Sequence, residues 1–350
     1  MRDNTANNIE MTDDSGCFHF ADCDDVGNVF YLALPIFAAF HFDGVDENQQ
    51  EKFLDEIKAL QGEFYIDNVK IEYKTLDNIK DYSHITHLLR QKCMRPRKFF
   101  LYQMSVSNAS HLLVPYDNFS AEQCFIATIL SYLQTFAYSL AYALGLYCEG
   151  LFDVDNFVVY YNKNNYGICG GLLSSFSSLH DCNDDVCNMS MKLSLQKTLN
   201  WFLSIDDVLK ACGTTALGKS LSIYSRMFSS ISGDEEVFMS GLFSVMALEA
   251  LYESHGSKNA LSEKVAAFLE IDKTRCKKEI DEIYDHRCSV AHGGFKLPFK
   301  FNANDGSKDF ETSYGEVNEV FELGLLYLFK SYRKMILENK RDLSFAYKCL

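Results

Sequence analysis

The sequence predicts an α+β fold in which a mixed α/β N-terminal domain is followed by an all-α helical bundle. Short β-type apolar runs alternate with helical patterns in the first half, and the pattern in the second half is almost purely helical. The length of 350 residues also favours two domains, at roughly 150 residues each. A hydrophobic content of 47%, with 28 Phe, can form a folded core and excludes a disordered acidic chain.

The first half contains segments with the two-residue period of a strand and segments with the 3.6-residue period of a helix. The segments with a β-type pattern are 64–66, 69–73, 99–106, 157–161 and 166–169. The segments with a helical pattern are 47–60, 76–93 and 124–148. Because the Asn-rich stretch 162–165 separates the last two β-type segments, we expect these two to form a hairpin.

The second half is expected to consist of helices. The expected helices are 191–212, 216–231, 235–252, 261–269, 273–291 and 314–337. The stretch 170–188 has little periodicity and is rich in Gly, Ser, Asp and Asn, which is typical of a linker. We therefore predict domains at 1–185 and 186–350, and the absence of a fixed-period repeat argues against a solenoid.

Charge and cysteine usage indicate a cytoplasmic protein; no cofactor is expected, and a structural zinc is an alternative with weak support. The net charge of −15 excludes a protein that coats nucleic acid by bulk charge, although it leaves room for a local basic site. The 12 Cys are scattered without the C-x2-C spacing of a zinc knuckle, so we interpret them as reduced thiols. Residues 1–25 are acidic and carry no early apolar run, unlike a secretory signal.

Two apolar stretches were considered as membrane spans. Residues 29–42 are too few to cross a bilayer and include Pro35. Residues 124–148 carry no charge and are long enough. Polar residues nevertheless recur along this segment at helical spacing, at Thr128, Ser131, Thr135, Tyr138 and Tyr142. Since lipid penalises such a stripe, we expect a core helix of a soluble protein and no membrane partner.

One motif matches a phosphate-binding loop. It reads Gly213-Thr-Thr-Ala-Leu-Gly218-Lys219-Ser220. A true loop of this kind follows a buried strand, whereas residues 204–212 have a helical pattern. The context therefore favours a helix end at Gly213 and a short turn, with a nucleotide site at Lys219 as the alternative.

An arginine and a histidine are expected at one helix end. Arg287 lies within the apolar stripe of the predicted helix 273–291, so its guanidinium requires a carboxylate or a phosphate. This stripe contains Ile280, Ile283, Tyr284, Val290 and Ala291. Glu249, the single charge in residues 237–252, is the obvious partner. His292 follows five residues after Arg287, immediately before two glycines that favour a helix end. The alternative interpretation is a structural Glu–Arg pair with His292 as an uninvolved helix cap.

These residues resemble a known family. The stretch Glu282-Ile-Tyr-Asp285-His-Arg287-Cys-Ser-Val-Ala-His292-Gly293 is similar to the R-x4-H signature of HEPN domains, in particular their Apea-like branch. The stretch Met246-Ala-Leu-Glu249-Ala-Leu251 is similar to the preceding helix of that branch. The resemblance covers the predicted domain 186–350 and implies a HEPN helical bundle. The N-terminal domain carries no such resemblance, and a sensor and an RNA-binding module are both open for it.

The resemblance implies a metal-independent endoribonuclease. His292 would act as general acid and base in the attack of a ribose 2′-hydroxyl, and Arg287 would stabilise the negative phosphate. The products would carry a 2′,3′-cyclic phosphate and a 5′-hydroxyl. Glu249 would position Arg287, with Tyr284, Asp285 and Cys288 as further supporting residues. Cys288 departs from many HEPN nucleases, which have Asn, Asp or His directly after the arginine.

The resemblance also implies a biological role and partners. HEPN nucleases of this kind are toxin-like effectors in antiphage defence and abortive infection, and they act as homodimers or higher even oligomers. Their substrates are host or phage RNA, with tRNA as one candidate, and a phage-derived trigger or a regulatory protein would control them. The alternative is a non-catalytic HEPN module that binds RNA or a partner protein.

Two basic stretches are candidate RNA contacts, because cations interspersed with aromatic residues suit single-stranded RNA. The first contains Arg90, Lys92, Arg95, Arg97 and Lys98. The second lies near the C-terminus and contains Lys330, Arg333 and Lys334. Composition alone is equally compatible with solvated surfaces.

Overall fold

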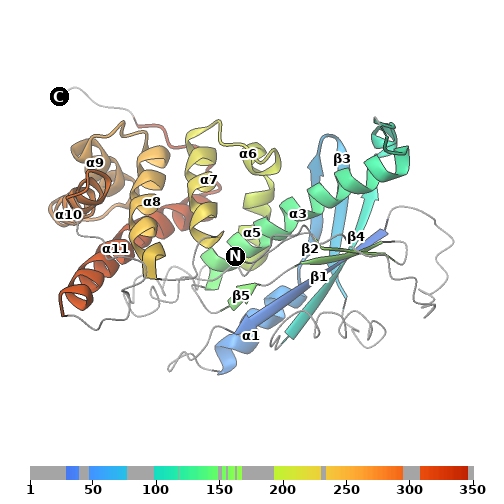
Figure 1. The fold of residues 1–350 in the computed structure, drawn as a ribbon, viewed down its shortest axis with the longest axis horizontal. Coiled ribbons are helices and arrows are strands. Elements are labelled where there is room, and N and C mark those ends of the chain that lie inside the picture. Colours follow the sequence, from blue (N-terminus) through green and yellow to red (C-terminus); the bar gives the residue numbers. More distant parts are fainter. Residues whose placement is uncertain are drawn as a thin grey trace. The chain divides into compact units, whose positions relative to one another are not determined.

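The protein has a mixed fold of helices and an antiparallel sheet, which confirms the predicted α+β class (Figure 1). The computed structural model describes residues 29–38, 47–76, 98–116, 118–148, 152–154, 157–161, 164–167, 193–229, 234–294 and 308–345. These residues fall into two compact units, of which the first contains the sheet and the second most of the helices.

The sheet of the first unit has the strand order β2-β3-β4-β1-β6-β7. Its strands are β1 (Val29–Ala38), β2 (Gln61–Ile66), β3 (Val69–Thr75), β4 (Lys98–Ser107), β6 (Val158–Tyr161) and β7 (Asn164–Gly167). All of these neighbours pair antiparallel. The five predicted β-type segments are therefore present, and the predicted hairpin 157–169 is confirmed by pairing that reaches Tyr161↔Asn164.

The central strand β1 was not predicted as a strand. It pairs with β4 on one side, with Leu32 opposite Tyr102, and with β6 on the other. The consecutive residues Leu32, Ala33 and Leu34 are all buried. Because successive side chains of a strand point to opposite faces, both faces of β1 lie within the core. A strand buried on both faces reads as a continuous apolar run without alternation, which is why residues 29–42 resembled a short membrane segment.

The hairpin between β2 and β3 is closed by a two-residue turn. Asp67 and Asn68 have φ values of 48° and 67°, which match the turn that suits the twist of paired strands. Asp67 also accepts a hydrogen bond from the hydroxyl of Tyr132 at 2.9 Å. Because Tyr132 belongs to helix α3 (Ala121–Cys148), this contact ties the turn to the helix that covers the sheet.

Helix α3 packs as a core helix. The Phe136 ring lies 5.6 Å from the ring of Phe64, 4.7 Å from that of Tyr73 and 6.0 Å from that of Tyr102. Among the described helices, α3 is long and apolar enough to cross a membrane, but half of its most apolar window is buried inside the protein. The buried half packs in the core, and the residues of the polar stripe lie on the less buried side of the helix.

Helices α1 (Glu47–Lys58) and α3 both cross the division between the two units. Residues 138–148 of α3 belong with the helices, where the Tyr142 ring lies 6.4 Å from that of Phe202 and 6.1 Å from that of Tyr224. The units therefore differ from the predicted consecutive domains 1–185 and 186–350, because the two halves of α3 pack in different units. The predicted linker 170–188 and most of the predicted helix 76–93 lie outside the described residues.

The second unit is built mainly from helices of the C-terminal half. They are α5 (Leu195–Leu203), α6 (Asp206–Leu209), α7 (Ala216–Ser229), α8 (Asp234–Tyr252), α9 (Lys258–Leu269), α10 (Lys273–Ala291) and α11 (Lys308–Glu338). Helix α8 packs against α7 and α11, and α10 packs against α9.

The remaining short elements are η2 (Ser110–Leu112) and β5 (Phe152–Val154).

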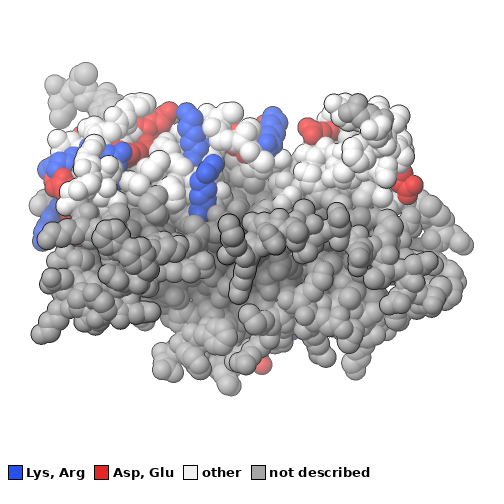
Figure 2. Space-filling view, viewed as in Figure 1, with Lys and Arg blue, Asp and Glu red and all other residues white. Residues whose placement is uncertain are grey.

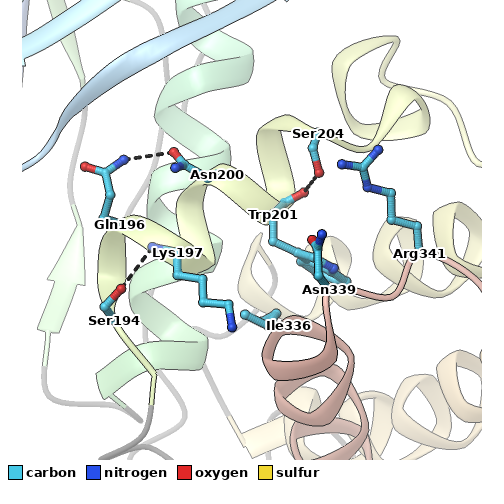
Figure 3. A pocket seen from close by; sticks show the side chains of 9 residues that line it. All are labelled: Ser194, Gln196, Lys197, Asn200, Trp201, Ser204, Ile336, Asn339 and Arg341. Carbon is cyan, nitrogen blue, oxygen red and sulfur yellow. Dashed lines mark hydrogen bonds between the residues drawn. The ribbon is translucent and has the colours of Figure 1, made fainter.

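The predicted helix 191–212 is divided into α5 and α6. Ser194 caps the start of α5 by accepting from the backbone N–H of Lys197. Ser204 donates its hydroxyl to the carbonyl of Trp201 at 2.7 Å, and Ile205 then adopts an extended conformation (Figure 3). Since serine hydroxyls compete for backbone groups, Ser204 ends the helix that the apolar period alone would continue.

Candidate functional site

Helix α10 delivers the candidate catalytic pair to its C-terminal end. Asp272 caps its start, and Cys276, Ile280, Ile283 and Tyr284 form its buried face. The last turn leaves the core, since Val290 is half-buried and Ala291 is exposed, although both were predicted on the buried stripe.

The end of α10 is closed by a Schellman motif. The backbone N–H of Gly294 donates to the carbonyl of Ser289 at 2.8 Å, and that of Gly293 donates to Val290 at 3.3 Å. Gly293 has a φ of 71°, a conformation that favours glycine. The predicted helix end is therefore confirmed, and it leaves His292 exposed as the C-cap residue.

Arg287 pairs with Glu249 of α8, as the sequence predicts. The distance between Arg287 Nη2 and Glu249 Oε2 is 3.7 Å, and the side chains are 26% and 15% exposed. The Arg287 guanidinium also lies 5.5 Å from the centre of the Tyr284 ring. The pair therefore joins α10 to α8 close to the turn that carries His292.

The hydrogen-bonding capacity of this pair is largely unused. Glu249 Oε1 and Arg287 Nε are both buried and have no hydrogen-bond partner among the residues that the structure describes. Beyond the ion pair, the contact described for Arg287 Nη1 is a long one, of 3.9 Å to the sulfur of Cys288. Because buried polar atoms are normally paired, this arrangement leaves donors for an anion that reaches the site.

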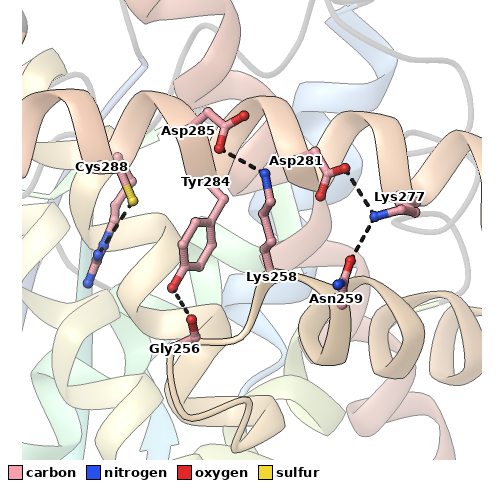
Figure 4. A network of polar contacts seen from close by, with 9 residues as sticks. Gly256, Lys258, Asn259, Lys277, Asp281, Tyr284, Asp285 and Cys288 are labelled. Atoms are coloured by element: carbon pink, nitrogen blue, oxygen red, sulfur yellow. Dashed lines mark hydrogen bonds and ion pairs between the residues drawn. The ribbon is translucent and has the colours of Figure 1, made fainter.

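Tyr284 has a structural contact at this site. Its hydroxyl donates to the carbonyl of Gly256 at 2.5 Å, which links α10 to the turn between α8 and α9 (Figure 4). Burial raises the pKa of Tyr284, and the neighbouring Glu249 carboxylate raises it further. Tyr284 thus stays protonated and holds the helix that carries Arg287.

Asp285 is not brought together with Arg287. It is 69% exposed and pairs with Lys258 at the start of α9 at 3.0 Å (Figure 4). Positions two residues apart on a helix point to nearly opposite faces, so Asp285 and Arg287 serve different neighbours. The same outer face carries a second contact, in which Lys277 binds Asn259 at 2.7 Å and Asp281 at 3.2 Å.

The predicted basic residues near the C-terminus are engaged within the protein. Arg333 is fully buried and donates to the carbonyl of Leu146 through Nε at 3.0 Å and Nη2 at 2.8 Å, so its prediction as an RNA contact is wrong. Lys334 is paired with Glu270 at 2.6 Å and its side chain is 16% exposed. Lys330 is half-buried on the same helix.

The other predicted basic stretch is largely outside the described residues. Arg90, Lys92, Arg95 and Arg97 are not described, and Lys98 is described only as a backbone position at the start of β4. On the face shown in Figure 2, the described Lys and Arg side chains are interspersed with Asp and Glu side chains. In the described part of this face, the cations therefore do not form a continuous basic patch.

In the segment that matches a phosphate-binding loop, a carboxylate of the protein itself accepts the hydrogen bonds that a phosphate would accept. Asp207 accepts from the backbone N–H groups of Thr214 and Thr215 at 3.1 and 2.8 Å and from their hydroxyls at 2.5 and 2.6 Å. A Cβ atom at Gly218 would lie 1.8 Å from Asp207 Oδ2, so the close approach requires glycine. Ser220 is fully buried and binds Tyr332 and the carbonyl of Ala247. The motif therefore forms the turn that leads into α7. This favours the interpretation as a short turn over that as a nucleotide site.

Asp207→Asn is expected to lower the free energy of unfolding by about 2 kcal/mol, because it weakens several hydrogen bonds to a buried carboxylate. Burial raises the pKa of Asp207, but the hydrogen bonds from Thr214 and Thr215 outweigh it and lower the pKa from 3.8 to about 2. The contribution is therefore complete above a pH of about 4 and is lost as the pH falls toward about 2. Urea unfolding at neutral pH and at a pH of about 3 measures it.

Asp206→Asn is the matched control, since Asp206 is 83% exposed and its side-chain contact within the described residues is a long ion pair of 3.7 Å with Lys210. An equal loss of stability in the two variants would contradict the structural role of Asp207.

The described residues contain no cluster of three or more His, Cys, Asp or Glu side chains arranged to hold a metal ion. No family model, curated protein or solved structure matches the chain.

Proposed function

We propose that this protein is a metal-independent endoribonuclease of the HEPN type, with its site at the C-terminal end of α10. One observation carries the proposal: within the described residues, Arg287 is held by one long ion pair and has unused donors, five residues before an exposed His292 on the same helix end. A guanidinium with unused donors suits a phosphate, and an imidazole takes up and releases protons near neutral pH.

The proposed reaction needs only these two side chains and the substrate. His292 takes the proton of a ribose 2′-hydroxyl, which attacks the adjacent phosphate, and the bond to the 5′-oxygen of the next nucleotide breaks. A protonated histidine, from the same or a second copy of the chain, gives its proton to that leaving oxygen. Arg287 stabilises the additional negative charge on the phosphate, and Glu249 keeps the guanidinium in place.

The sequence resemblance of the α8 and α10 segments to Apea-like HEPN domains supports the proposal. Under it, the C-terminal helices are a HEPN bundle and two copies bring their Arg287 and His292 together. The last turn of α10 suits such a dimer, because Val290 is half-buried and Ala291 is exposed. The protein would then be a cytoplasmic, toxin-like effector of antiphage defence that cleaves host or phage RNA, including tRNA, under the control of a phage-derived trigger or a regulatory protein.

A non-catalytic module that binds RNA or a partner protein is the second candidate. Cys288 favours it, because this residue follows the arginine where many HEPN nucleases carry a polar side chain. Binding of RNA without any cleavage of it would support this alternative.

Total RNA incubated with the purified protein and EDTA is expected to be cleaved. The new ends should carry 2′,3′-cyclic phosphate and 5′-hydroxyl groups, because the 2′-hydroxyl is the nucleophile and no metal takes part. The end groups are read by the response of the fragments to a cyclic phosphodiesterase and to a polynucleotide kinase. Fragments with 5′-phosphate ends, or cleavage that requires added Mg²⁺, would overturn the proposed chemistry.

A further inference from the structure

A polar pocket of about 480 Å³ lies between α5 and the C-terminal end of α11, away from the residues of the proposed catalytic site (Figure 3). Among the described residues, its lining includes two cations, Lys197 and Arg341, and the carboxamide of Asn339, and these residues include no Asp or Glu. In a chain with a net charge of −15, a pocket whose described charged residues are both cations is a local site for an anion.

The walls of the pocket are fixed by hydrogen bonds. The buried indole of Trp201 donates through Nε1 to the carbonyl of Lys340 at 2.8 Å. Lys197 Nζ donates to the carbonyl of Leu337 at 3.0 Å. Asn339 has a φ of 55°, which turns the chain at the end of α11 and places the following residues along α5. The pocket is therefore formed before any ligand arrives.

The lining has more donors than it uses. Within the described part of the chain, the guanidinium of Arg341 has no hydrogen bond or ion pair, and it offers five N–H groups. Lys197 uses one of its three donors on Leu337. A ligand that complements this surface must be rich in negatively charged acceptors.

The two cations also define the shape of the ligand. Lys197 and Arg341 lie toward opposite ends of the pocket, with Trp201 and Asn339 between them (Figure 3). A chain of anions that runs along the pocket would engage both cations, one with each of two charges. A nucleic-acid strand has this chemistry, since its phosphates repeat along the backbone and are separated by sugars that offer hydrogen-bond acceptors.

We propose that this pocket binds the phosphodiester backbone of single-stranded nucleic acid, with Lys197 and Arg341 each contacting a phosphate and Asn339 contacting the sugar between them. The proposal concerns binding and does not rest on the proposed cleavage. Protein–phosphate contacts of this kind give affinity without sequence preference and make binding strongly dependent on salt.

The test is fluorescence anisotropy with a labelled oligodeoxyuridylate of roughly 12 nucleotides, a length within the usual range for single-strand sites. This probe has the phosphodiester backbone but no 2′-hydroxyl, so the proposed nuclease cannot cleave it. Arg341→Ala and Lys197→Ala are each expected to weaken binding about fivefold to tenfold and to reduce the salt slope by about 0.7. The double variant should lose both contributions.

Lys278→Ala is the charge-matched control, because Lys278 is exposed on α10 and lies outside the pocket lining. Its affinity should equal that of the wild type, and thermal unfolding should show all variants folded. Wild-type protein that does not bind the probe, or a double variant that binds it as tightly as the Lys278→Ala control, would overturn the proposal. A mononucleotide that competes as well as the strand would also overturn it, since the pocket would then accept a single phosphate.

Discussion

Arg287→Lys is expected to reduce RNA cleavage by about 100-fold or more, which corresponds to the loss of one donor to a developing negative charge. Lysine keeps the positive charge beside Glu249 but lacks the planar fork that binds two phosphate oxygens together. The free energy of unfolding should change by less than about 0.5 kcal/mol, because the ion pair it replaces is long and partly exposed. Initial rates on RNA and urea unfolding of the same preparations measure the two effects.

Arg333→Lys is the matched substitution on α11 and should give the opposite result. Arg333 is fully buried, and its two hydrogen bonds to the carbonyl of Leu146 depend on the guanidinium geometry. We expect this variant to lose about 1–3 kcal/mol of stability. Its folded fraction should cleave RNA as the wild type does. If Arg287→Lys instead lowers stability by as much as Arg333→Lys and leaves cleavage unchanged, Arg287 is a structural residue.

His292→Asn is expected to reduce RNA cleavage by about 10²–10⁴-fold, the usual contribution of a general acid or base. His292 is exposed at the C-cap of α10, and its side chain has no hydrogen-bond partner among the described residues. Its replacement should therefore leave the thermal unfolding midpoint unchanged, so the loss of cleavage cannot be attributed to the fold. Single-turnover cleavage of a defined RNA measures the chemical step.

His255→Asn is the control for this variant. His255 is exposed in the turn between α8 and α9, where its φ of 51° is well tolerated by asparagine. Cleavage by His255→Asn should match that of the wild type. A loss of similar size in both histidine variants would show that the effect does not belong to the end of α10.

The sequence was sufficient to predict the end of α10 and the Arg287–Glu249 pair because both depend on local rules. A glycine pair after an apolar stripe favours a helix end, and an arginine within such a stripe must find a partner. The same stripe rule would have identified Arg333, which lies one turn after the buried Phe329. The number of cations near the C-terminus does not reveal that Arg333 is buried, because composition does not show the direction of a side chain.

Other features could not be predicted from local patterns. The burial of both faces of β1 depends on strands from distant parts of the sequence, so its apolar run has no alternation to reveal a strand. The division of α3 between two units follows from tertiary packing alone. In the loop 213–220, the carboxylate that replaces a phosphate comes from Asp207, and motif matching of the loop itself does not include that residue.

Cleavage of total RNA in EDTA by the wild type and by the Arg287→Lys/His292→Asn double variant tests the proposed site most directly. We predict that the wild type produces fragments with 2′,3′-cyclic phosphate ends and that the double variant, with an unchanged thermal unfolding midpoint, produces none. Cleavage of equal rate and pattern by the two proteins would contradict the assignment of the site to the end of α10.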